Sequence, residues 1–468
     1  MEEYVNSKCG LCVAHTLHDV YSFIKDLQHR GRDACGIAAI GDRIDIMKWA
    51  GAVGNVDLGD LHKIFPAEQY HTYMAHVRYK TRGREAKLLE DTHPHAIGGR
   101  VIAHENHLII RNCDAAAVHN GEADMEPFYG ARAKHSCDTP LLLDYYWQNG
   151  AHQLMRNIPG SYFLALADRD NVLVMRDRFG VKPGCMGLKD GKYCAASESV
   201  AFKNNGAIFI EDIEPGTIYY LSPKGRFKKE RVFSEQPQHC KFDWQYISHL
   251  ESILDGIPVR NLRREAGIEL AREYKPDVDV VTYLPRCPET TARSYCKERG
   301  IESSFMDVFY KLKSERAFQG ANQEDRDNSI SSNLHLLPRM EDILRDKRVL
   351  VIDDSTIRGT NARHAKKLLD LCEVKSVCYG NYTAQIGIIG DDGIPRGCMF
   401  GVDMPPTDNF IVRAMNKPRN RTNKEINRSL GMEVYFLSRE GEFRSFERAG
   451  IKREHLCSFC VGGKHPFK

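Results

Sequence analysis

The sequence predicts two domains of different fold class, an α+β sandwich followed by an α/β domain with a parallel sheet. The first half contains short apolar runs of strand type in pairs, such as CGIAAI and YFLALAD, with a helix-like segment beside them. The second half alternates strand and helix, as in KRVLVI followed by ARHAKKLLDLCE, which is typical of a parallel sheet. The stretch 222–239 is polar, carries two prolines and has little periodicity, so we place the domain boundary there.

The individual elements follow from local patterns. In the first half, strands are expected at 35–40, 72–79, 162–168 and 171–177, and a helix that ends in glycine at 18–31. In the second half, a helix is expected at 267–274 and 362–373, with strands at 277–285, 347–352 and 376–384. The polar stretch 312–345 is either a mobile lid over a site or a solvated surface loop.

Composition limits the class of protein. The chain has 468 residues, of which 42% are hydrophobic and 28% charged, and its net charge of +3 is not concentrated in any block, which argues against nucleic-acid binding. No apolar run approaches the roughly 20 residues that span a bilayer, and the first eight residues lack the pattern of a secretory signal. We therefore expect a cytoplasmic protein without membrane contact. In a reducing compartment its 15 cysteines are expected to be buried fillers, a reactive thiol and metal ligands.

The strongest local signal is the segment from Arg348 to Thr360. A buried strand ends in Asp353 and Asp354, and a small polar loop containing Gly359 leads into a helix. Loop amides and a helix N-terminus bind phosphate, and Ser355 and Thr360 offer hydroxyl groups. The two acids would bind sugar hydroxyls or Mg²⁺ at the carboxyl end of the strand. The alternative is a capped helix in which Asp354 is only a turn residue.

The segment VLVIDDSTIRGT resembles the phosphoribosyl-diphosphate loop of type I phosphoribosyltransferases, and especially that of glutamine phosphoribosyl-diphosphate amidotransferases. The resemblance implies that Asp353 and Asp354 bind the ribose hydroxyls and Mg²⁺. It also implies that the following loop holds the 5′-phosphate, through Ser355, Thr356, Arg358, Gly359 and Thr360.

A candidate nucleophile lies near the start of the chain. A cysteine thiol needs a base, and a free α-amino group can serve only if Cys9 becomes the first residue, so removal of residues 1–8 is a requirement of this mechanism. The alternative is that Cys9 is a small buried apolar residue.

Six segments resemble those of N-terminal-nucleophile amidotransferases, in the same order. They are LQHRGRDACGI from Leu27, AHVRYKTRG from Ala75, AVHNG from Ala117, SCDT from Ser136, RDRFGVKP from Arg176 and ASES from Ala196. The resemblance implies an αββα sandwich glutaminase of the N-terminal-nucleophile class, followed by an α/β phosphoribosyltransferase domain. We expect a propeptide at 1–8, the glutaminase at 9–232 and the transferase at 233–468.

The resemblance also assigns roles in glutamine hydrolysis. Asn120 and the Gly121 amide would form the oxyanion hole, which must hold a developing negative charge. The substrate would be bound by Arg30, Arg78 and Asp138; Arg78 would pair with its α-carboxylate, for which a planar guanidinium is suited, and Asp138 with its α-ammonium. Taken alone, Arg78 is equally well a surface charge.

Four cysteines form a second candidate site. Cys457 and Cys460 are spaced as C-x₂-C, which suits a metal or an iron–sulfur cluster but also a redox pair. The segments around Cys240 and Cys398 and the terminal LCSFCVGGKHP resemble the cluster-bearing branch of the same family. The resemblance implies that Cys240, Cys398, Cys457 and Cys460 bind a structural [4Fe–4S] cluster, with a structural Zn²⁺ as the rival.

Two places depart from the family pattern. Leu284–Glu289 reads LPRCPE where a PDSG-type diphosphate loop is expected, with Arg286 in place of an acid. The lid pattern has Asn333 where a lysine is expected. The resemblance implies an amidotransferase that makes 5-phosphoribosylamine from glutamine and phosphoribosyl diphosphate, as a homo-oligomer (dimer or tetramer) with nucleotide feedback sites. The departures leave open a related enzyme with another sugar-phosphate acceptor, or a non-catalytic nucleotide-binding regulator.

Overall fold

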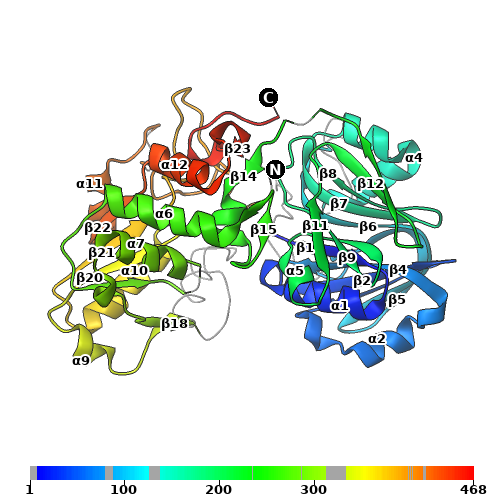
Figure 1. Ribbon diagram of the computed structural model, residues 1–468, viewed down its shortest axis with the longest axis horizontal. Coiled ribbons are helices and arrows are strands. Elements are labelled where there is room, and N and C mark those ends of the chain that lie inside the picture. Colours follow the sequence, from blue (N-terminus) through cyan, green and yellow to red (C-terminus); the bar gives the residue numbers. More distant parts are fainter. Residues whose placement is uncertain are drawn as a thin grey trace.

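The computed structural model describes residues 8–79, 88–125, 137–234, 236–285, 287–311, 334–398, 404–414 and 418–467, together with residues 400 and 402. These residues form two halves that lie side by side (Figure 1). The first half in sequence is built on a large antiparallel sheet and the second on a small parallel one.

The large sheet contains 13 strands in the order β11-β9-β10-β1-β4-β2-β3-β6-β7-β8-β12-β13, with β5 paired to β6. Their bounds are β1 (Gly10–Ala14), β2 (Ala34–Gly41), β3 (Ile44–Ala50), β4 (Tyr70–Arg78), β5 (His95–Ala103), β6 (His107–Ala123), β7 (Gly160–Asp168), β8 (Val172–Arg176), β9 (Cys185–Lys189), β10 (Lys192–Ala196), β11 (Ile208–Asp212), β12 (Thr217–Leu221) and β13 (Phe227–Arg231).

Alternation along these strands produces three stacked hydrophobic cores. Leu11 and Val13 of β1 pack with Phe163 of β7 in a core between the two portions of the sheet, which we call the inter-sheet core. The residue between them, Cys12, belongs to a second core under the helices of one side. On β7, Leu164 belongs to a third core under the helix of the other side. Because strand side chains alternate in direction, this arrangement is a four-layer αββα sandwich.

The outer layers are helices with one apolar face. Helix α1 (Leu17–Asp26) begins at Thr16, whose side chain accepts the N–H of Asp19, and buries its apolar face in the second core together with α2 (Leu58–Ile64) and α5 (Val200–Lys203). Helix α4 (Thr139–Asn157) packs on β6 and β7 in the third core.

The small sheet carries the second half. Its four strands are all parallel in the order β17 (Val280–Tyr283), β20 (Arg348–Asp353), β21 (Ser376–Asn381) and β22 (Glu433–Phe436). Helices α6 (Val259–Glu273) and α7 (Glu289–Arg299) share a core with one face, and α10 (Thr360–Leu371) and α11 (Asn423–Leu430) with the other. Helix α12 (Arg439–Ala449) packs along α6, and the short α9 (Met340–Leu344) precedes β20.

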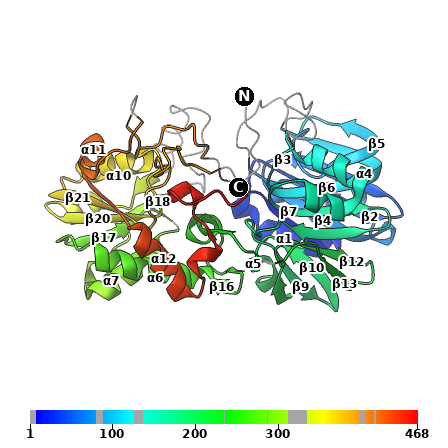
Figure 2. The same cartoon turned by 90° about the horizontal axis from the view of Figure 1, so that it is seen from above.

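Short strand pairs complete the second half. Strand β14 (His239–Cys240) pairs in parallel with β23 (Leu456–Cys457), β15 (Ile253–Leu254) pairs with β16 (Ile257–Pro258), and β18 (Phe309–Lys311) pairs with β19 (Leu334–Leu336). Figure 1 shows β14 and β23 between the two sheets, and Figure 2 shows the end of the chain there. The pairing of β14 with β23 therefore lies close to the junction of the halves.

The predicted fold class is confirmed in both halves, and each expected strand is present. The helix expected at 18–31 is shorter, because it ends at Asp26 and a 3₁₀ turn over Gln28–Arg30 follows. Most of the predicted lid lies outside the described residues, which resume at β19. No helix in the described ranges is long and apolar enough to cross a membrane.

Candidate active sites

Cys9 lies directly before β1 and is fully buried. Leu11 and Val13 belong to the inter-sheet core, and alternation turns Cys9 to the same side. In the neighbouring strand β4, His76 is paired with Leu11, so the register places Arg78 opposite Cys9. The structure thus brings Cys9 and Arg78 together at one end of the space between the sheet layers.

Asn120 and Gly121 lie near the end of β6. Asn120 is paired with Phe163 of the inter-sheet core, so its side chain points to the same side as Cys9. It is fully buried, and neither its amide nitrogen nor its oxygen has a hydrogen-bond partner among the described residues. An unpaired buried polar group costs about 1–3 kcal/mol, which is typical of a group reserved for a ligand. At Gly121 a Cβ atom would lie 1.9 Å from the Ser161 carbonyl oxygen, so only glycine fits.

Asp138 directly precedes α4 and is held toward the end of β6. Its Oδ2 accepts the Ala123 N–H at 2.8 Å, and its Oδ1 lies 3.5 Å from His119 Nδ1. Burial raises the pKa of Asp138, but the charge of His119 and hydrogen bonds from His119 and Ala123 outweigh it, so the pKa lies below its usual value. A carboxylate kept charged at this place is suited to binding an ammonium group.

Arg78 is buried with its guanidinium fixed by protein groups. Nη1 donates to the Leu88 carbonyl at 3.0 Å, and Nη2 lies 3.6 Å from Asp91. Nε has no partner among the described residues. The arginine is therefore not a surface charge, which removes the alternative reading of this residue.

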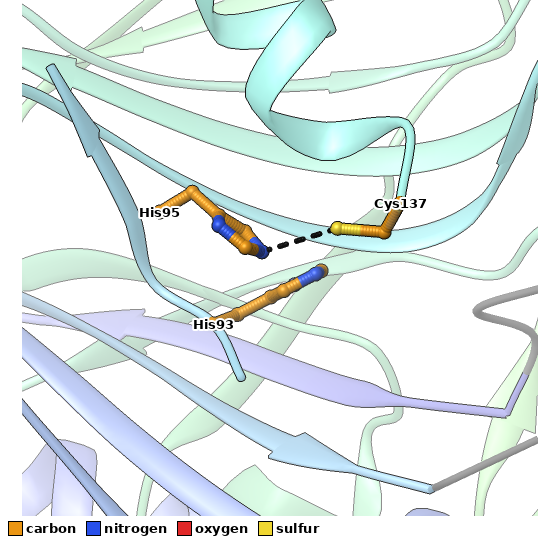
Figure 3. A group of neighbouring side chains, drawn as sticks. All are labelled: His93, His95 and Cys137. Atoms are coloured by element: carbon orange, nitrogen blue, oxygen red, sulfur yellow. Dashed lines mark hydrogen bonds between the residues drawn. The ribbon is translucent and has the colours of Figure 1, made fainter. Parts of the chain in front are cut away.

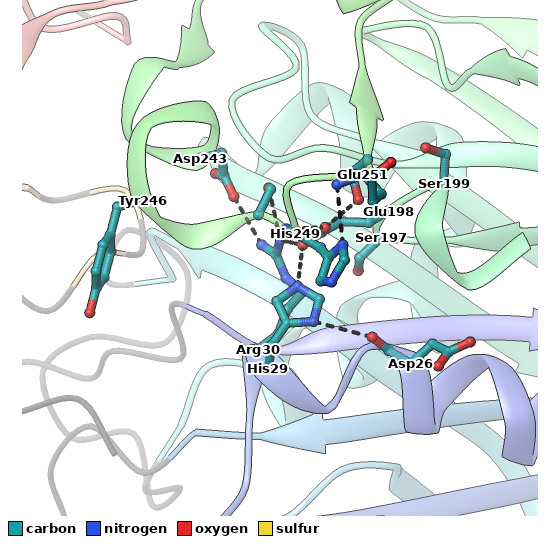
Figure 4. A network of polar contacts seen from close by, with 12 residues as sticks. Asp26, His29, Arg30, Ser197, Glu198, Ser199, Asp243, Tyr246, His249 and Glu251 are labelled. Carbon is teal, nitrogen blue, oxygen red and sulfur yellow. Dashed lines mark hydrogen bonds and ion pairs between the residues drawn. The ribbon is translucent and has the colours of Figure 1, made fainter. Parts of the chain in front are cut away.

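Arg30 is at the centre of a buried polar network that links both halves (Figure 4). Its Nε donates to the Cys9 carbonyl at 3.1 Å, Nη1 forms an ion pair with Glu198, and Nη2 lies 3.0 Å from Asp243. Glu198 also accepts from three more groups, the side chains of His29 and Ser252 and the N–H of His249. The three guanidinium nitrogens of Arg30 are thus all bound to protein atoms. Arg30 contacts the backbone of Cys9, at its carbonyl group.

Burial and charge shift the pKa values in this region. Burial lowers the pKa of Arg30, but the charges of Glu198 and Asp243 hold it above its usual value. Burial raises the pKa of Glu198, but His29 and Arg30 hold it well below its usual range. The thiol of Cys9 has a raised pKa because burial outweighs a backbone hydrogen bond and the nearby positive charges. The thiol therefore needs a base to become a nucleophile.

The loop after β20 surrounds a small pocket at the carboxyl end of the parallel sheet. The pocket is lined by Asp353 and by residues 355–362, which include the start of α10. The Ser355 hydroxyl donates to Asp354 at 2.6 Å, and the Thr356 hydroxyl donates to Asn381 at 2.7 Å. Two further groups shape the loop: Arg358 forms an ion pair with Asp408, and Gly359 has a φ of +81°. A helix start preceded by a glycine turn is suited to binding a phosphate.

The two acids at this place are buried and close together. Asp353 accepts the hydroxyl of Tyr379 at 2.6 Å and the N–H of Asp354 at 2.9 Å. Burial raises the pKa of both carboxyls, and the charge on Asp353 raises that of Asp354 further. A bound cation or a donor hydroxyl group would stabilise both as carboxylates, which fits a site for Mg²⁺ or ribose.

The loop expected to hold a diphosphate follows β17 and contains two prolines. Leu284 donates to the Ile352 carbonyl at 3.1 Å, so the loop begins beside the acids of β20. Pro285 and Pro288 have no N–H to donate, and Pro288 directly precedes α7. Arg286 and residues 312–333, including Asn333, lie outside the described residues.

Cys240, Cys398, Cys457 and Cys460 line one cavity, together with apolar side chains. Cys240 and Cys457 are register partners in the β14–β23 pair, and Cys460 follows in the 3₁₀ turn Phe459–Val461. The N–H groups of Phe400 and Val402 donate to the Cys398 sulfur at 3.4 and 3.3 Å. The structure therefore brings together the four cysteines that the sequence grouped.

A single Zn²⁺ would require these sulfurs to lie close together. Zn²⁺ binds thiolates at about 2.3 Å, so a tetrahedral site holds its sulfurs about 3.8 Å apart. Within the described ranges, one set of three or more ligand-type side chains has its atoms within 4.8 Å of one another, and it is His93, His95 and Cys137. The four cysteines form no such set within the described residues.

Sequence reasoning missed several groups of these sites. Tyr379 and Asp408 bind Asp353 and Arg358, and no motif marks them. It also missed the set His93, His95 and Cys137, for which the only signal was the pair of histidines in THPH.

Comparison with known proteins matches both halves. The sequence model of a glutamine amidotransferase domain matches residues 123–235. Amidophosphoribosyltransferase of Archaeoglobus fulgidus is 28% identical over 95% of this chain and 94% of its own length. The Methanocaldococcus jannaschii protein of the same name is 27% identical over 96% and 94%, and that of Bacillus subtilis 25% identical over 95% and 90%.

Two solved structures share the fold over nearly the whole chain. One is an allosteric regulatory enzyme of purine biosynthesis, with a TM-score of 0.79 at 22% identity, covering 98% of this chain and 96% of that one. The other is the glutamine phosphoribosylpyrophosphate amidotransferase of B. subtilis complexed with ADP and GMP, with a TM-score of 0.78 at 23% identity and coverages of 98% and 97%. The fold is therefore that of these structures, an αββα sandwich joined to an α/β domain with a parallel sheet, and a glutamine amidotransferase domain model matches part of the first half. The chain is thus similar over nearly its whole length to amidophosphoribosyltransferases.

Proposed function

We propose that this protein transfers ammonia from glutamine to phosphoribosyl diphosphate and forms 5-phosphoribosylamine, glutamate and diphosphate, the first step of purine synthesis. The observation that carries the proposal is the presence of both half-sites in one chain that amidophosphoribosyltransferases match over about its full length. Domain limits of 9–232 and 233–468 are supported by the end of β13 at Arg231 and the start of β14 at His239.

The glutaminase step uses the groups at the end of the sandwich. After removal of residues 1–8, the α-amine of Cys9 takes the thiol proton, and the sulfur attacks the amide carbon of glutamine. Asn120 and the Gly121 N–H stabilise the oxyanion, the α-ammonium of Cys9 returns the proton to the amide nitrogen, the C–N bond breaks, and ammonia leaves. Water then hydrolyses the thioester to glutamate. Arg78 and Asp138 bind the α-carboxylate and α-ammonium groups, and Asp138 is suited by its lowered pKa.

Arg30 receives a different role from the one expected. Each of its three nitrogens is bound to a protein atom, of Cys9, Glu198 or Asp243, and the side chain is fully buried. We assign Arg30 as a positioning residue that holds the Cys9 carbonyl.

In the transferase step, ammonia reaches C1 of the ribose inside the protein and displaces diphosphate. The loop from Ser355 to Thr360 holds the 5′-phosphate, with Arg358 fixed by Asp408, and Asp353 and Asp354 bind the ribose hydroxyls. Mg²⁺ bound near the two acids would neutralise the charge that develops on the leaving diphosphate.

Cys240, Cys398, Cys457 and Cys460 would hold a [4Fe–4S] cluster with a structural role. Their arrangement around one cavity supports this assignment. A cytoplasmic location is supported by the state of the thiols, because all 15 cysteines are unpaired. We also propose a homo-oligomer. We further propose nucleotide feedback sites, since a B. subtilis enzyme that shares the fold was solved in complex with ADP and GMP.

One observation favours a second function, a glutamine amidotransferase with another sugar-phosphate acceptor. Pro288 removes a backbone donor from the loop that would bind the diphosphate, and Arg286 replaces its acid. An acceptor whose leaving group is smaller would need fewer such donors.

The test measures both products of the proposed reaction. The protein is purified without oxygen, removal of residues 1–8 is checked by mass, and glutamate and diphosphate release are measured with Mg²⁺, with and without phosphoribosyl diphosphate. Equal release of both, dependent on phosphoribosyl diphosphate, is the expected result. Glutamate without diphosphate would favour the second function, and neither product from a processed chain would refute both.

A further inference from the structure

His93, His95 and Cys137 form a buried group of metal-ligating side chains that has no role in the proposed reaction (Figure 3). His95 opens β5, His93 lies two residues before it, and Cys137 directly precedes Asp138. Their exposures are 0% for His93, 8% for His95 and 4% for Cys137. The group therefore lies inside the sandwich, beside the glutaminase site.

The spacing of these side chains is close to that of a single metal ion. One ligand-type atom from each residue lies within 4.8 Å of the other two, and Cys137 Sγ is 3.4 Å from His95 Nε2. A tetrahedral Zn²⁺ with Zn–N of about 2.05 Å and Zn–S of about 2.3 Å would hold those two atoms about 3.6 Å apart. The pair is already at this separation, and the third side chain needs to close by about an ångström.

We propose that His93, His95 and Cys137 bind a borderline divalent cation of the Zn²⁺ class, with Cys137 as the thiolate. Two imidazoles and one thiolate are the donor set that such ions prefer, and a fourth position would be left to solvent. Binding forms three metal–ligand bonds and releases the thiol proton of Cys137 to solvent.

The charges around the group are balanced enough to admit a cation. Lys48 is buried near Cys137, and burial lowers its pKa to about 8. Asp91 is also near Lys48 and Cys137, and Asp138 follows Cys137 directly. The thiolate and these two carboxylates oppose the positive charges of Lys48 and Arg78.

Metal binding at this group is coupled to the oxyanion hole through His93. Its Nδ1 accepts the N–H of His119 at 3.1 Å, while His76 Nε2 is hydrogen-bonded to the His119 carbonyl at 3.0 Å. A neutral imidazole has one nitrogen lone pair, so whichever nitrogen of His93 binds a metal, the His119 N–H loses its acceptor. Because His119 directly precedes Asn120, the cation and the ordered oxyanion strand compete for His93. We therefore expect Zn²⁺ to inhibit glutamine hydrolysis; this part of the inference rests on the proposed glutaminase, whereas metal binding does not.

Metal binding is tested by metal content. The anaerobically purified protein is equilibrated with Zn²⁺, separated from free metal, and its zinc per chain is compared with that of Cys137→Ser and His95→Gln. Cys185→Ser is the matched control, since Cys185 is also buried in this half but donates to a backbone carbonyl, that of Ala196. Zinc bound at any other site is present equally in the unsubstituted protein and in the three variants, so it cancels in the comparison. We expect one zinc per chain fewer in the two site variants and no change in the control; equal zinc in all would overturn the proposal.

A second readout identifies the thiolate. With Co²⁺ in place of Zn²⁺, the protein should show a thiolate-to-cobalt absorption band that Cys137→Ser lacks and Cys185→Ser retains. An identical band in Cys137→Ser would overturn the assignment of Cys137 as a ligand. Circular dichroism checks the fold of each variant, and His95→Gln keeps the test valid if Cys137→Ser does not fold.

The coupling is tested separately by glutamate release. Zn²⁺ should lower the rate of glutamate release by the unsubstituted protein about tenfold, because the oxyanion strand loses a backbone hydrogen bond. The rate of the Cys137→Ser variant should fall less than about twofold. Zn²⁺ also binds nucleophilic thiols, and both proteins retain Cys9. Equal inhibition of the two would therefore place the effect at Cys9 and refute the coupling, while the zinc measurement would still decide the binding.

Discussion

The buried network around Arg30 gives the sharpest stability prediction. Arg30→Met removes the guanidinium and keeps most of the side-chain volume. Glu198 retains the donors His29, Ser252 and His249, whereas Asp243 Oδ1 loses its hydrogen bond from Arg30. Removing one partner of a buried ion pair costs about 3–5 kcal/mol, and the donors left on Glu198 place the expected loss near the lower end. That is a large share of the about 5–15 kcal/mol that stabilises a typical protein.

The assay is urea unfolding followed by tryptophan fluorescence, since buried Trp244 is next to Asp243 in sequence. Arg260→Met is the matched control, because its ion pair with Glu251 is exposed and should contribute less than about 1 kcal/mol. In the double variant Arg30→Met, Asp243→Asn, a neutral amide replaces the carboxylate that lost its partner. The free energy of unfolding should then rise by about 1–2 kcal/mol relative to Arg30→Met alone. A loss below about 1 kcal/mol in Arg30→Met, or no recovery in the double variant, would refute the reasoning.

Three further outcomes are expected. Asn120→Ala should lower kcat for glutamate release about 10²–10³-fold with the fold intact, and a loss below about tenfold would remove Asn120 from the oxyanion hole. Burial lowers the pKa of His76 to about 3 in the folded protein, against about 6.5 in the unfolded chain. The unfolded chain therefore binds a proton first as the pH falls, so the free energy of unfolding is highest above pH 6.5 and about 3 kcal/mol of it is lost by pH 4. His76→Gln should flatten that part of the measured stability–pH curve, and an unchanged slope would contradict the assignment. Cys457→Ser should lose the about four irons per chain that a [4Fe–4S] cluster supplies, whereas a protein that contains one zinc and no iron would rule the cluster out.

The sequence predicts the scaffold well because its signals are local. Alternation of apolar residues sets the strands, and the acids before Gly359 mark the end of β20 without knowledge of the rest of the chain. Motif resemblance also groups Cys240 with Cys457, which become register partners. These features depend on patterns within about a dozen residues or on a known order of segments.

The interactions of the candidate sites were less predictable, because they depend on register between distant segments. Arg30 was expected to face glutamine, but its partners Cys9, Glu198 and Asp243 are set by how β1, the end of β10 and the start of the second half meet. Cys137 and His95 come from different elements, and each alone is an ordinary buried residue. No spacing rule connects them in the sequence.

The alternation of β6 restricts how the protein can evolve. Asn120 points into the inter-sheet space, as Val118 does, whereas Ala117 faces α4. Deleting or inserting one residue within this strand would turn every later side chain to the opposite face and remove the amide from beside Cys9. Point substitutions at positions other than Asn120 and Gly121 can accumulate in this strand, but changes in its length cannot. We therefore expect natural length variation in this half to occur at exposed turns such as that between β12 and β13, where added residues leave the register of β6 unchanged.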